Sequence, residues 1–293
     1  MLVAKASERR SLRFPPPTQA NLVLALACLV LALPMLYNVA KFSWSTEQGG
    51  HGPLVLATGL WLLWREYKQA DAPRVPPHPL FASIAIGLLL IVFFLARVTG
   101  ILEIEAFAIY GALLVGAYLL WGGAILQQLW FPLLYLALTL PPPDSVVAAV
   151  TQPIKILISQ TAVSLLHGLG YPIANSGVMI QIAQYELLVA AACAGLNSIL
   201  SLSAICLFYG YLRHRSDFTQ LSLIALAIIP VAILSNFVRV LVLILVTYYL
   251  GEAAAQGFLH NFAGLTMFLA ALISIFAYDE LVERIRSGLR RTA

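Results

Sequence analysis

The chain has 293 residues, of which 61% are hydrophobic and only 10% are charged, and its formal net charge is +4. Soluble domains carry about 25% charged residues, so this composition excludes an ordinary water-soluble protein of this length. The basic residues cluster at the two termini and in two short loops, as in membrane proteins that follow the positive-inside rule. We therefore expect no nucleic-acid partner.

Apolar stretches that can cross the hydrocarbon core of a bilayer recur along the chain. The sequence predicts about eight transmembrane helices, at residues 20–40, 53–66, 79–98, 101–120, 123–140, 190–212, 219–250 and 258–279. We therefore predict an all-α, polytopic membrane helical bundle that forms a single membrane domain over residues 1–293. Helices one to five lie within 20–140, and helices six to eight lie within 190–279.

Lysine and arginine residues give the predicted bundle a direction. They are concentrated in the N-terminal tail, in the loops after the second and sixth helices, and in the C-terminal tail, which all fall on one side of an eight-helix bundle. The positive-inside rule assigns that side to the cytoplasm. We expect a multi-pass protein of the cell (inner) membrane whose tails, residues 1–19 and 280–293, are both cytoplasmic.

The longest stretch between predicted helices, residues 141–189, then falls on the outer side. Its three prolines and Asp144 are typical of a helix start. Polar and apolar residues alternate with helical spacing over 144–168, which predicts an amphipathic helix in the membrane interface. Asn175-Ser176-Gly177 is a turn signal between two β-prone stretches, so a short hairpin is expected next.

Three residues that are far apart in the sequence share one predicted depth. Cys193 begins the sixth helix and His260 begins the eighth, and both helices start on the outer side. Arg239 lies about 20 residues into the seventh helix, which starts inside, so a rise of about 1.5 Å per residue brings it to the outer surface. The topology therefore predicts that the three residues meet near the outer leaflet.

The chemistry of these residues is complementary. A cysteine thiolate is a strong nucleophile, and a histidine can take the thiol proton and later return it to a leaving group. The permanent charge of an arginine can stabilise the thiolate or an oxyanion. Acyl transfer by Cys193 would need these three roles, and we expect no metal ion or cofactor. Each residue also has an ordinary interpretation, as a packed thiol, a capping histidine or a snorkelling arginine.

Five further residues are candidates for supporting roles in substrate binding. Gly195 and Asn197 follow the cysteine, and the small residues there would let a substrate backbone approach, although close helix packing explains them equally well. Asn236 precedes Arg239 by one helical turn and so shares its face. Tyr185 and Glu186, just before the sixth helix, could bind substrate or orient His260, or could be ordinary surface residues.

The sequence has three separated motifs: Ala192-Cys193-Ala194-Gly195-Leu196-Asn197-Ser198, Asn236-Phe237-Val238-Arg239-Val240 and His260-Asn261-Phe262-Ala263-Gly264. Together they resemble the exosortase/archaeosortase family over roughly residues 20–280. That family comprises multi-pass membrane proteins regarded as cysteine transpeptidases. The resemblance implies catalytic roles for Cys193, Arg239 and His260.

The resemblance also implies a partner, which is an exported protein with a C-terminal transmembrane sorting signal such as PEP-CTERM. Two positions depart from the family pattern. Many members have arginine where Asn197 stands and a second histidine where Asn261 stands. The subtype, the signal sequence and the oligomeric state therefore stay open.

Two other classes of function are compatible with a polytopic membrane protein. A small-solute transporter could use Glu103, Glu105 and Arg239 as charges along a path through the membrane. A non-catalytic subunit of an export or polysaccharide assembly system would need none of these roles. The sequence shows no internal repeat, which many transporters have.

Overall fold

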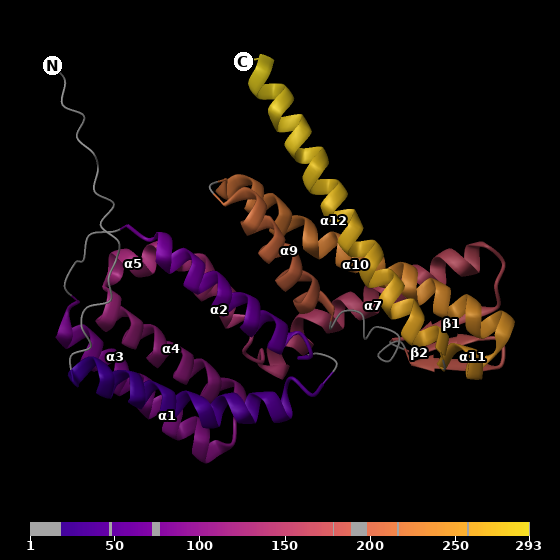
Figure 1. Cartoon of the computed structure of the whole chain (residues 1–293). Coiled ribbons are helices and arrows are strands. Elements are labelled where there is room, and N and C mark those ends of the chain that lie inside the picture. Colours follow the sequence, from indigo (N-terminus) through magenta and orange to yellow (C-terminus); the bar gives the residue numbers. More distant parts are fainter. Residues whose placement is uncertain are drawn as a thin grey trace. The chain divides into compact units, whose positions relative to one another are not determined.

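The computed structural model describes residues 19–46, 49–71, 77–177, 179–188, 198–215, 217–256 and 258–292 (Figure 1). The described chain is mostly helical, which confirms the predicted all-α fold class. It divides into two compact units, Met1–Pro141 and Pro142–Ala293. Each unit has hydrophobic clusters of its own.

The helices of the first unit are α1 (Gln19–Phe42), α2 (Gly52–Gln69), α3 (Pro79–Thr99), α4 (Leu102–Trp121), α5 (Gly123–Gln128) and α6 (Trp130–Ala137). Helices α3 and α4 form an antiparallel hairpin, because Gly100 adopts the left-handed conformation (φ 73°) that ends a helix and reverses the chain. Arg97 on α3 forms an ion pair with Glu105 on α4 at 2.7 Å. Helix α1 packs against α4, and α2 packs against α6.

The predicted fifth helix is divided in two. The structure has α5 and α6 where the sequence predicts one continuous helix over 123–140, and the division falls at Leu129. Pro132 gives the physical reason, because a proline has no backbone N–H to continue the helical ladder and its ring disfavours helical geometry in the preceding residues.

Two side chains tie the loop before α2 to the turn after α6. The indole Nε1 of Trp44 donates to the carbonyl of Thr139 at 3.0 Å, and His51 Nε2 lies 3.3 Å from the carbonyl of Leu138. A Cβ at Gly52 would lie 2.1 Å from the Trp44 indole, so only glycine fits there. This contact fixes the start of α2 within the first unit.

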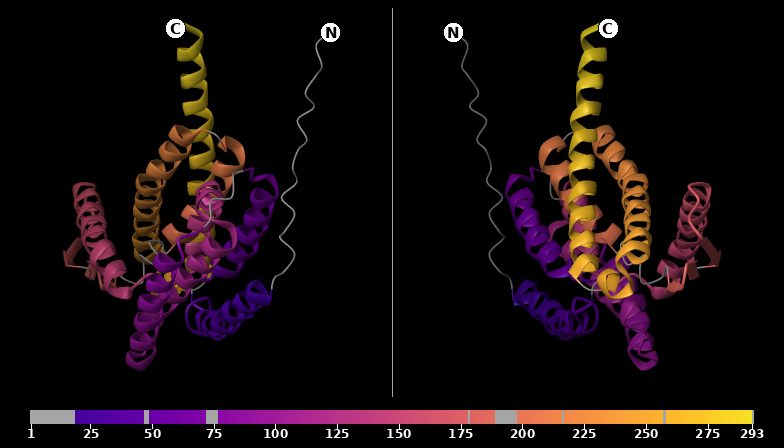
Figure 2. Two further views of the ribbon diagram at one scale, coloured as in Figure 1. Left: turned by 90° about the vertical axis from the view of Figure 1, so that its left-hand side faces the viewer. Right: turned by 90° about the vertical axis from the view of Figure 1, so that its right-hand side faces the viewer.

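The second unit contains α7 (Asp144–Gly168), β1 (Ile173–Ser176), β2 (Met179–Ile182), β3 (Tyr185–Leu188), α9 (Ser198–His214), α10 (Phe218–Leu250), α11 (Glu252–Gln256) and α12 (Phe258–Thr292). Helix α7 has the bounds that the sequence predicts for the amphipathic helix. Helix α12 continues 13 residues beyond the predicted end of the last apolar segment at 279. Figure 2 shows this extension projecting past the turn between α9 and α10.

The predicted hairpin is part of a three-stranded antiparallel sheet with the strand order β1-β2-β3. Its third strand, β3, was not expected from the sequence. Alternate side chains of the sheet, Ile173, Ile180 and Ile182, are buried in a cluster that also contains residues of α7 and α10. Gln181 and Glu186 lie on the opposite, exposed face. Burial of one face fixes the register of the sheet.

Helices α9, α10 and α12 form a bundle around a second cluster of buried side chains: Leu202, Cys206, Ile224, Ala227, Ile228, Ala232, Ala271 and Ile275. Small residues at several of these positions let the helices approach closely. Figure 1 shows the three helices running side by side.

Five helices in the described part of the chain are long and apolar enough to cross a membrane: α1 (from Leu22), α3, α4, α7 and α10. They expose large apolar side chains; α3, for example, buries only Ala82 and Ala96 among its 21 residues. In lipid such exposure carries no penalty, and the chain is a multi-pass membrane protein. The length and composition of α7 fit a membrane span as well as the interfacial helix that the sequence predicts.

Candidate functional site

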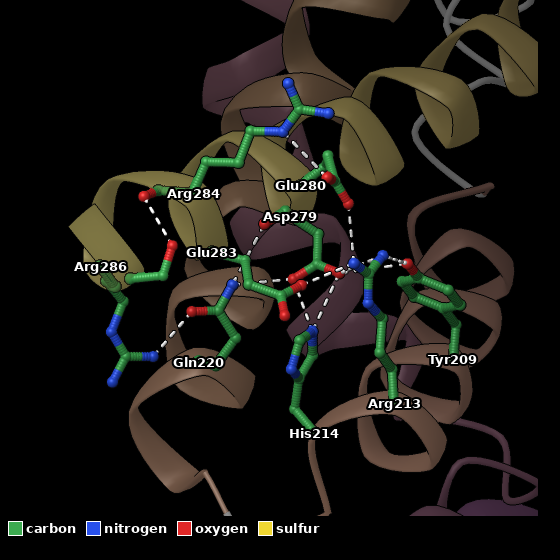
Figure 3. A network of polar contacts seen from close by, with 10 residues as sticks. Tyr209, Arg213, His214, Gln220, Asp279, Glu280, Glu283, Arg284 and Arg286 are labelled. Carbon is green, nitrogen blue, oxygen red and sulfur yellow. Dashed lines mark hydrogen bonds and ion pairs between the residues drawn. The ribbon is translucent and has the colours of Figure 1, made fainter. Parts of the chain in front are cut away.

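A network of polar side chains joins α9, α10 and α12 at one end of the second unit (Figure 3). At its centre, the fully buried Asp279 of α12 accepts a hydrogen bond from Gln220 Nε2 at 2.8 Å and one from the Tyr209 hydroxyl at 3.1 Å. His214 Nε2 lies 3.0 Å from the same carboxylate, and Arg213 lies 3.3 Å from it. A buried carboxylate needs such partners, because an unpaired buried charge is strongly unfavourable.

Exposed charges surround this buried centre. Arg213 forms ion pairs with Glu280 at 2.8 Å and with Glu283 at 2.6 Å, and Arg284 forms one with Glu280 at 3.0 Å. The hydrogen bond from Arg213, followed by that from Arg284, lowers the pKa of Glu280 below its ordinary value. The hydrogen bond to Glu280, followed by that to Tyr209, raises the pKa of Arg213 above its ordinary value.

The start of α10 is held by the same network. Asp217 caps the helix by accepting from the backbone N–H of Gln220 at 3.0 Å, as acidic residues commonly do at helix N-termini. Arg286 of α12 then forms an ion pair with Asp217 at 2.8 Å and donates to Gln220 Oε1 at 2.7 Å. These contacts join the first turn of α10 directly to α12.

The network also contains the best candidate for a metal site within the described residues. His214, Asp279 and Glu283 offer ligand atoms within 4.8 Å of one another. Arg213 already places a positive charge against both carboxylates, 3.3 Å from Asp279 and 2.6 Å from Glu283. The charges are therefore balanced by a side chain, and we assign the cluster a structural role.

The bond between Gln220 and Asp279 sets the register of two antiparallel helices. Arg239 lies 19 positions after Gln220, and His260 lies 19 positions before Asp279. With a rise of about 1.5 Å per residue, Arg239 and His260 each lie about 28 Å along their helices from the hydrogen-bonded pair Gln220 and Asp279. The backbones of α10 and α12 therefore bring Arg239 and His260 to the same level.

The packed core continues this register along the bundle. Ile275 lies four positions before Asp279, and Ile224 lies four positions after Gln220; both are fully buried in one cluster. Phe268 and Val231 pack against the same cluster. Phe268 lies 11 positions before Asp279, and Val231 lies 11 positions after Gln220. Side-chain packing therefore maintains the register of α10 and α12 over more than half of the distance from the Gln220–Asp279 bond to the candidate site.

Arg239 and Asn236 occupy buried positions one helical turn apart on α10. Arg239 is 8% exposed and Asn236 is 3% exposed, and the neighbouring Val240 belongs to the core that joins α10 to α7 and the sheet. Among the described residues, neither the Oδ1 nor the Nδ2 atom of Asn236 has a hydrogen-bond partner. Buried polar groups are almost always paired, so an unpaired amide suggests a ligand-binding role.

The two candidate residues of β3, Tyr185 and Glu186, belong to a strand that contacts α10. The Tyr185 hydroxyl is 3.5 Å from the position that a Cβ of Gly251 would occupy, in the turn that leads to α11 and α12. Glu186 is exposed and accepts a hydrogen bond from Gln181 Nε2 at 2.8 Å across the sheet. Only Tyr185 of this pair therefore lies against the bundle.

Three of the predicted site residues lie outside the described residues, and a fourth is described by its backbone alone. Cys193, Gly195 and Asn197 lie outside the described residues, between β3 and α9. His260 lies on α12, of which the backbone is described at this position but not the side chain. Their roles stay predictions.

Two of the three charges that a transporter would use, Glu103 and Glu105, belong to the first unit. Glu105 is buried near the start of α4 and is paired with Arg97 at 2.7 Å, and Glu103 lies in the same first turn. The pair closes the hairpin between α3 and α4, which is a sufficient structural reason for a buried carboxylate.

Sequence reasoning missed the polar network around Asp279. The available signal was Asp279 itself, an acidic residue that directly follows an apolar helical stretch, since such residues need a partner. Its partners Gln220 and His214 have no sequence pattern that identifies them, because they approach only when three helices pack.

The chain matches a protein-family model. The family model described as transmembrane exosortase matches residues 44–277. The matched range includes Cys193, Arg239 and His260. Comparisons with curated proteins and with solved structures find no match.

Proposed function

The chain belongs to the transmembrane exosortase family, and from this premise we propose that it is a membrane-embedded cysteine peptidase or transpeptidase. Its substrate would be an exported protein from which it removes a C-terminal sorting signal. The observation that carries the proposal is the family match over residues 44–277, within which the three motifs with Cys193, Arg239 and His260 occur. The common level of Arg239 and His260 supports it.

In the proposed reaction, the Cys193 sulfur attacks the carbonyl carbon of the scissile peptide bond. His260 takes the thiol proton and transfers it to the nitrogen of the leaving segment as the C–N bond breaks. Arg239 stabilises the negative charge that develops on the carbonyl oxygen. An amine or a water molecule then attacks the thioester, gives a proton to His260 and releases the thiolate.

Asn236 has a supporting place in this proposal. A peptide group needs one hydrogen-bond donor and one acceptor, and the Asn236 side chain offers both, with no partner in the described part of the chain. It lies one turn before Arg239 on the same helix, so a substrate backbone that reaches the guanidinium would also reach the amide. We assign it to substrate positioning.

The orientation follows from the same proposal and the distribution of basic residues. Both termini would lie in the cytoplasm, and the site would face the outer side of the cell (inner) membrane. The network around Asp279 would then lie on the cytoplasmic side, where its exposed ion pairs are in contact with water. A fluorescent protein fused after residue 293 tests this orientation, because it folds and becomes fluorescent only if the C-terminus lies in the cytoplasm.

The central experiment compares substitutions of the three cysteines. The probe is a reporter protein with a C-terminal PEP-CTERM sorting signal, produced together with the full chain in membranes. Cys193→Ala and Cys193→Ser should abolish processing while leaving the amount and thermal stability of the protein unchanged. Cys28→Ala and Cys206→Ala are matched controls on α1 and α9, and both should process the reporter. Normal processing by Cys193→Ala would overturn the proposed function.

A further inference from the structure

The strand β3 has one edge that no described strand covers. The sheet order is β1-β2-β3, so β3 pairs on one side with β2, in the register Ile182↔Tyr185, Gln181↔Glu186 and Ile180↔Leu187. Its other side is an edge, and exposed sheet edges are templates for a further strand. Natural proteins use such edges to bind extended peptides.

The register shows which backbone groups face this edge. A two-residue loop joins Ile182 to Tyr185, and in such a hairpin the closing pair exchanges its backbone hydrogen bonds. The next pair, Gln181 and Glu186, does not, so the N–H and C=O of Glu186 point away from β2. Glu186 is exposed, which makes this donor and acceptor accessible to a ligand.

The edge strand is linked, by the chain or by a contact, to the segments that carry the proposed chemistry. Cys193 follows Leu188 by five residues, which span at most about 18 Å even when fully extended. Strand β3 contacts α10, the helix that carries Arg239. The Tyr185 hydroxyl lies against Gly251, in the connection that leads to His260.

We propose that the free edge of β3 binds the extended segment of the exported protein that contains the scissile bond, as a fourth strand of the sheet. This inference rests on the proposed function and names where its substrate binds. A docked strand of about five residues is about 17 Å long, which matches the reach from β3 to Cys193. Backbone pairing would hold substrates of different sequence in one orientation, and side-chain contacts would add specificity.

The first test removes the outward N–H of β3 without disturbing its pairing with β2. Glu186→Pro does this, because the N–H at this position is not used within the sheet and proline is tolerated on sheet edges. Glu186→Ala measures separately the effect of losing the carboxylate. The purified full chain is titrated with the PEP-CTERM reporter in lipid nanodiscs. We expect Glu186→Pro to raise KM roughly five- to tenfold relative to Glu186→Ala, the effect of about one lost hydrogen bond, with kcat within about twofold.

Asn175→Pro is the matched control. Asn175 lies on β1 at the opposite edge of the same sheet and is, like Glu186, the second residue from a two-residue loop, so its N–H also points outward. This variant should keep the KM of the unchanged protein. Equal KM values for Glu186→Pro and Glu186→Ala would overturn the inference, as would an increase that Asn175→Pro shares.

A second test does not depend on catalysis. In a Cys193→Ala background, Glu186→Cys is oxidised together with reporters that carry one cysteine at each of ten successive positions around the cleavage site. A fourth strand presents alternate residues to the same face, so crosslinks should form at every second position. A helical spacing, or no crosslinks, contradicts strand pairing, and Asn175→Cys should give none.

The two proposals fail differently. If Cys193→Ala still processes the reporter, the proposed function is wrong whatever the crosslinks show. If Cys193→Ala is inactive but Glu186→Pro behaves as Glu186→Ala and the crosslinks lack the period of two, the function stands and strand docking is wrong.

Discussion

Gln220 Nε2 donates to Asp279 Oδ1 at 2.8 Å, and this bond joins α10 to α12 at two positions that are equally far along the chain from Arg239 and His260. Apolar contacts between membrane helices gain little from the hydrophobic effect, because lipid tails are as apolar as the helix surfaces. A buried polar contact selects one register, since every other arrangement leaves the carboxylate unpaired. The network thus positions the candidate site from about 28 Å away.

The first prediction concerns the stability that Asp279 provides. Asp279→Ala removes the common partner of Gln220, His214 and Tyr209 and should lower the free energy of unfolding by about 3 kcal/mol, the usual cost of breaking a buried ionic network. Thermal unfolding of the purified protein measures this. Glu283→Ala, which removes one exposed ion pair, should cost less than about 1 kcal/mol. Equal losses of stability for Asp279→Ala and Glu283→Ala would show that the buried carboxylate contributes no more than the exposed ion pair.

The second prediction is a dependence of stability on pH. Hydrogen bonds from Arg213 and then Arg284 lower the pKa of Glu280 in the folded protein below 4.5, its ordinary value. In the unfolded chain this carboxyl takes up a proton first, so its stabilising effect is complete above pH 4.5 and disappears as the pH falls through the lower folded value. Thermal unfolding temperatures measured down to pH 3 should therefore fall less steeply for Glu280→Gln than for the unchanged protein. Parallel curves would contradict this.

Local pattern accounts for what the sequence predicts correctly. Asp144 after three prolines marks the start of α7, and unbroken hydrophobicity defines α10, whose observed bounds are Phe218–Leu250. The break at Leu129 was missed because the apolar composition on both sides hides the effect of Pro132. Strand β3 was missed because its four residues are stabilised by pairing with β2 and burial against α10, neither of which is local.

The candidate site is predictable to a different extent. The motif and the predicted topology identify Arg239. The structure adds that Arg239 is buried one turn from the Asn236 amide, which has no partner among the residues described. That second fact depends on the positions of neighbouring helices, so composition and spacing cannot give it. The helix register fixed by Gln220 and Asp279 also cannot be read from composition and spacing. This contact lies far from the candidate site, yet it determines which residues of α10 and α12 lie at the same level there.

The third prediction tests the charge of Arg239. If the guanidinium stabilises an oxyanion, Arg239→Ala should lower kcat by about 10³-fold, in the range found when an oxyanion-stabilising donor is removed. Arg239→Lys keeps the charge but loses the planar set of donors, so it should retain about tenfold more activity than Arg239→Ala. Processing rates at saturating reporter concentration measure both. Similar kcat values for the two variants would show that charge is not what matters at this position.

The fourth prediction links His260 to the reactivity of Cys193. In a Cys28→Ala, Cys206→Ala background, iodoacetamide should alkylate Cys193 at pH 7 at least about tenfold more slowly when His260 is replaced by alanine, because a free thiol has a pKa of about 8.5 and is mostly protonated. The labelling rate of His260→Ala should then rise with pH through this value, whereas the parent should already be reactive at lower pH. Cys193→Ala provides the blank. Identical pH profiles with and without the imidazole would exclude an activated thiolate.

The fifth prediction separates a functional amide from a structural one. Asn236 is buried and its amide has no partner among the residues that the structure describes. Asn236→Leu replaces this polar group by an apolar group of similar size and should raise the free energy of unfolding by about 1 kcal/mol. Processing should nevertheless fall about tenfold, because the substrate loses a hydrogen-bond partner in a buried site. Ser159→Ala is the matched control: the Ser159 hydroxyl on α7 is also buried, with no partner in the described ranges, and its removal should stabilise the protein slightly and leave processing unchanged. Thermal unfolding and reporter titration on the same preparations measure both effects. A loss of stability in Asn236→Leu would show that the amide supports the fold, whereas a gain in stability with full processing would show that no substrate group binds it.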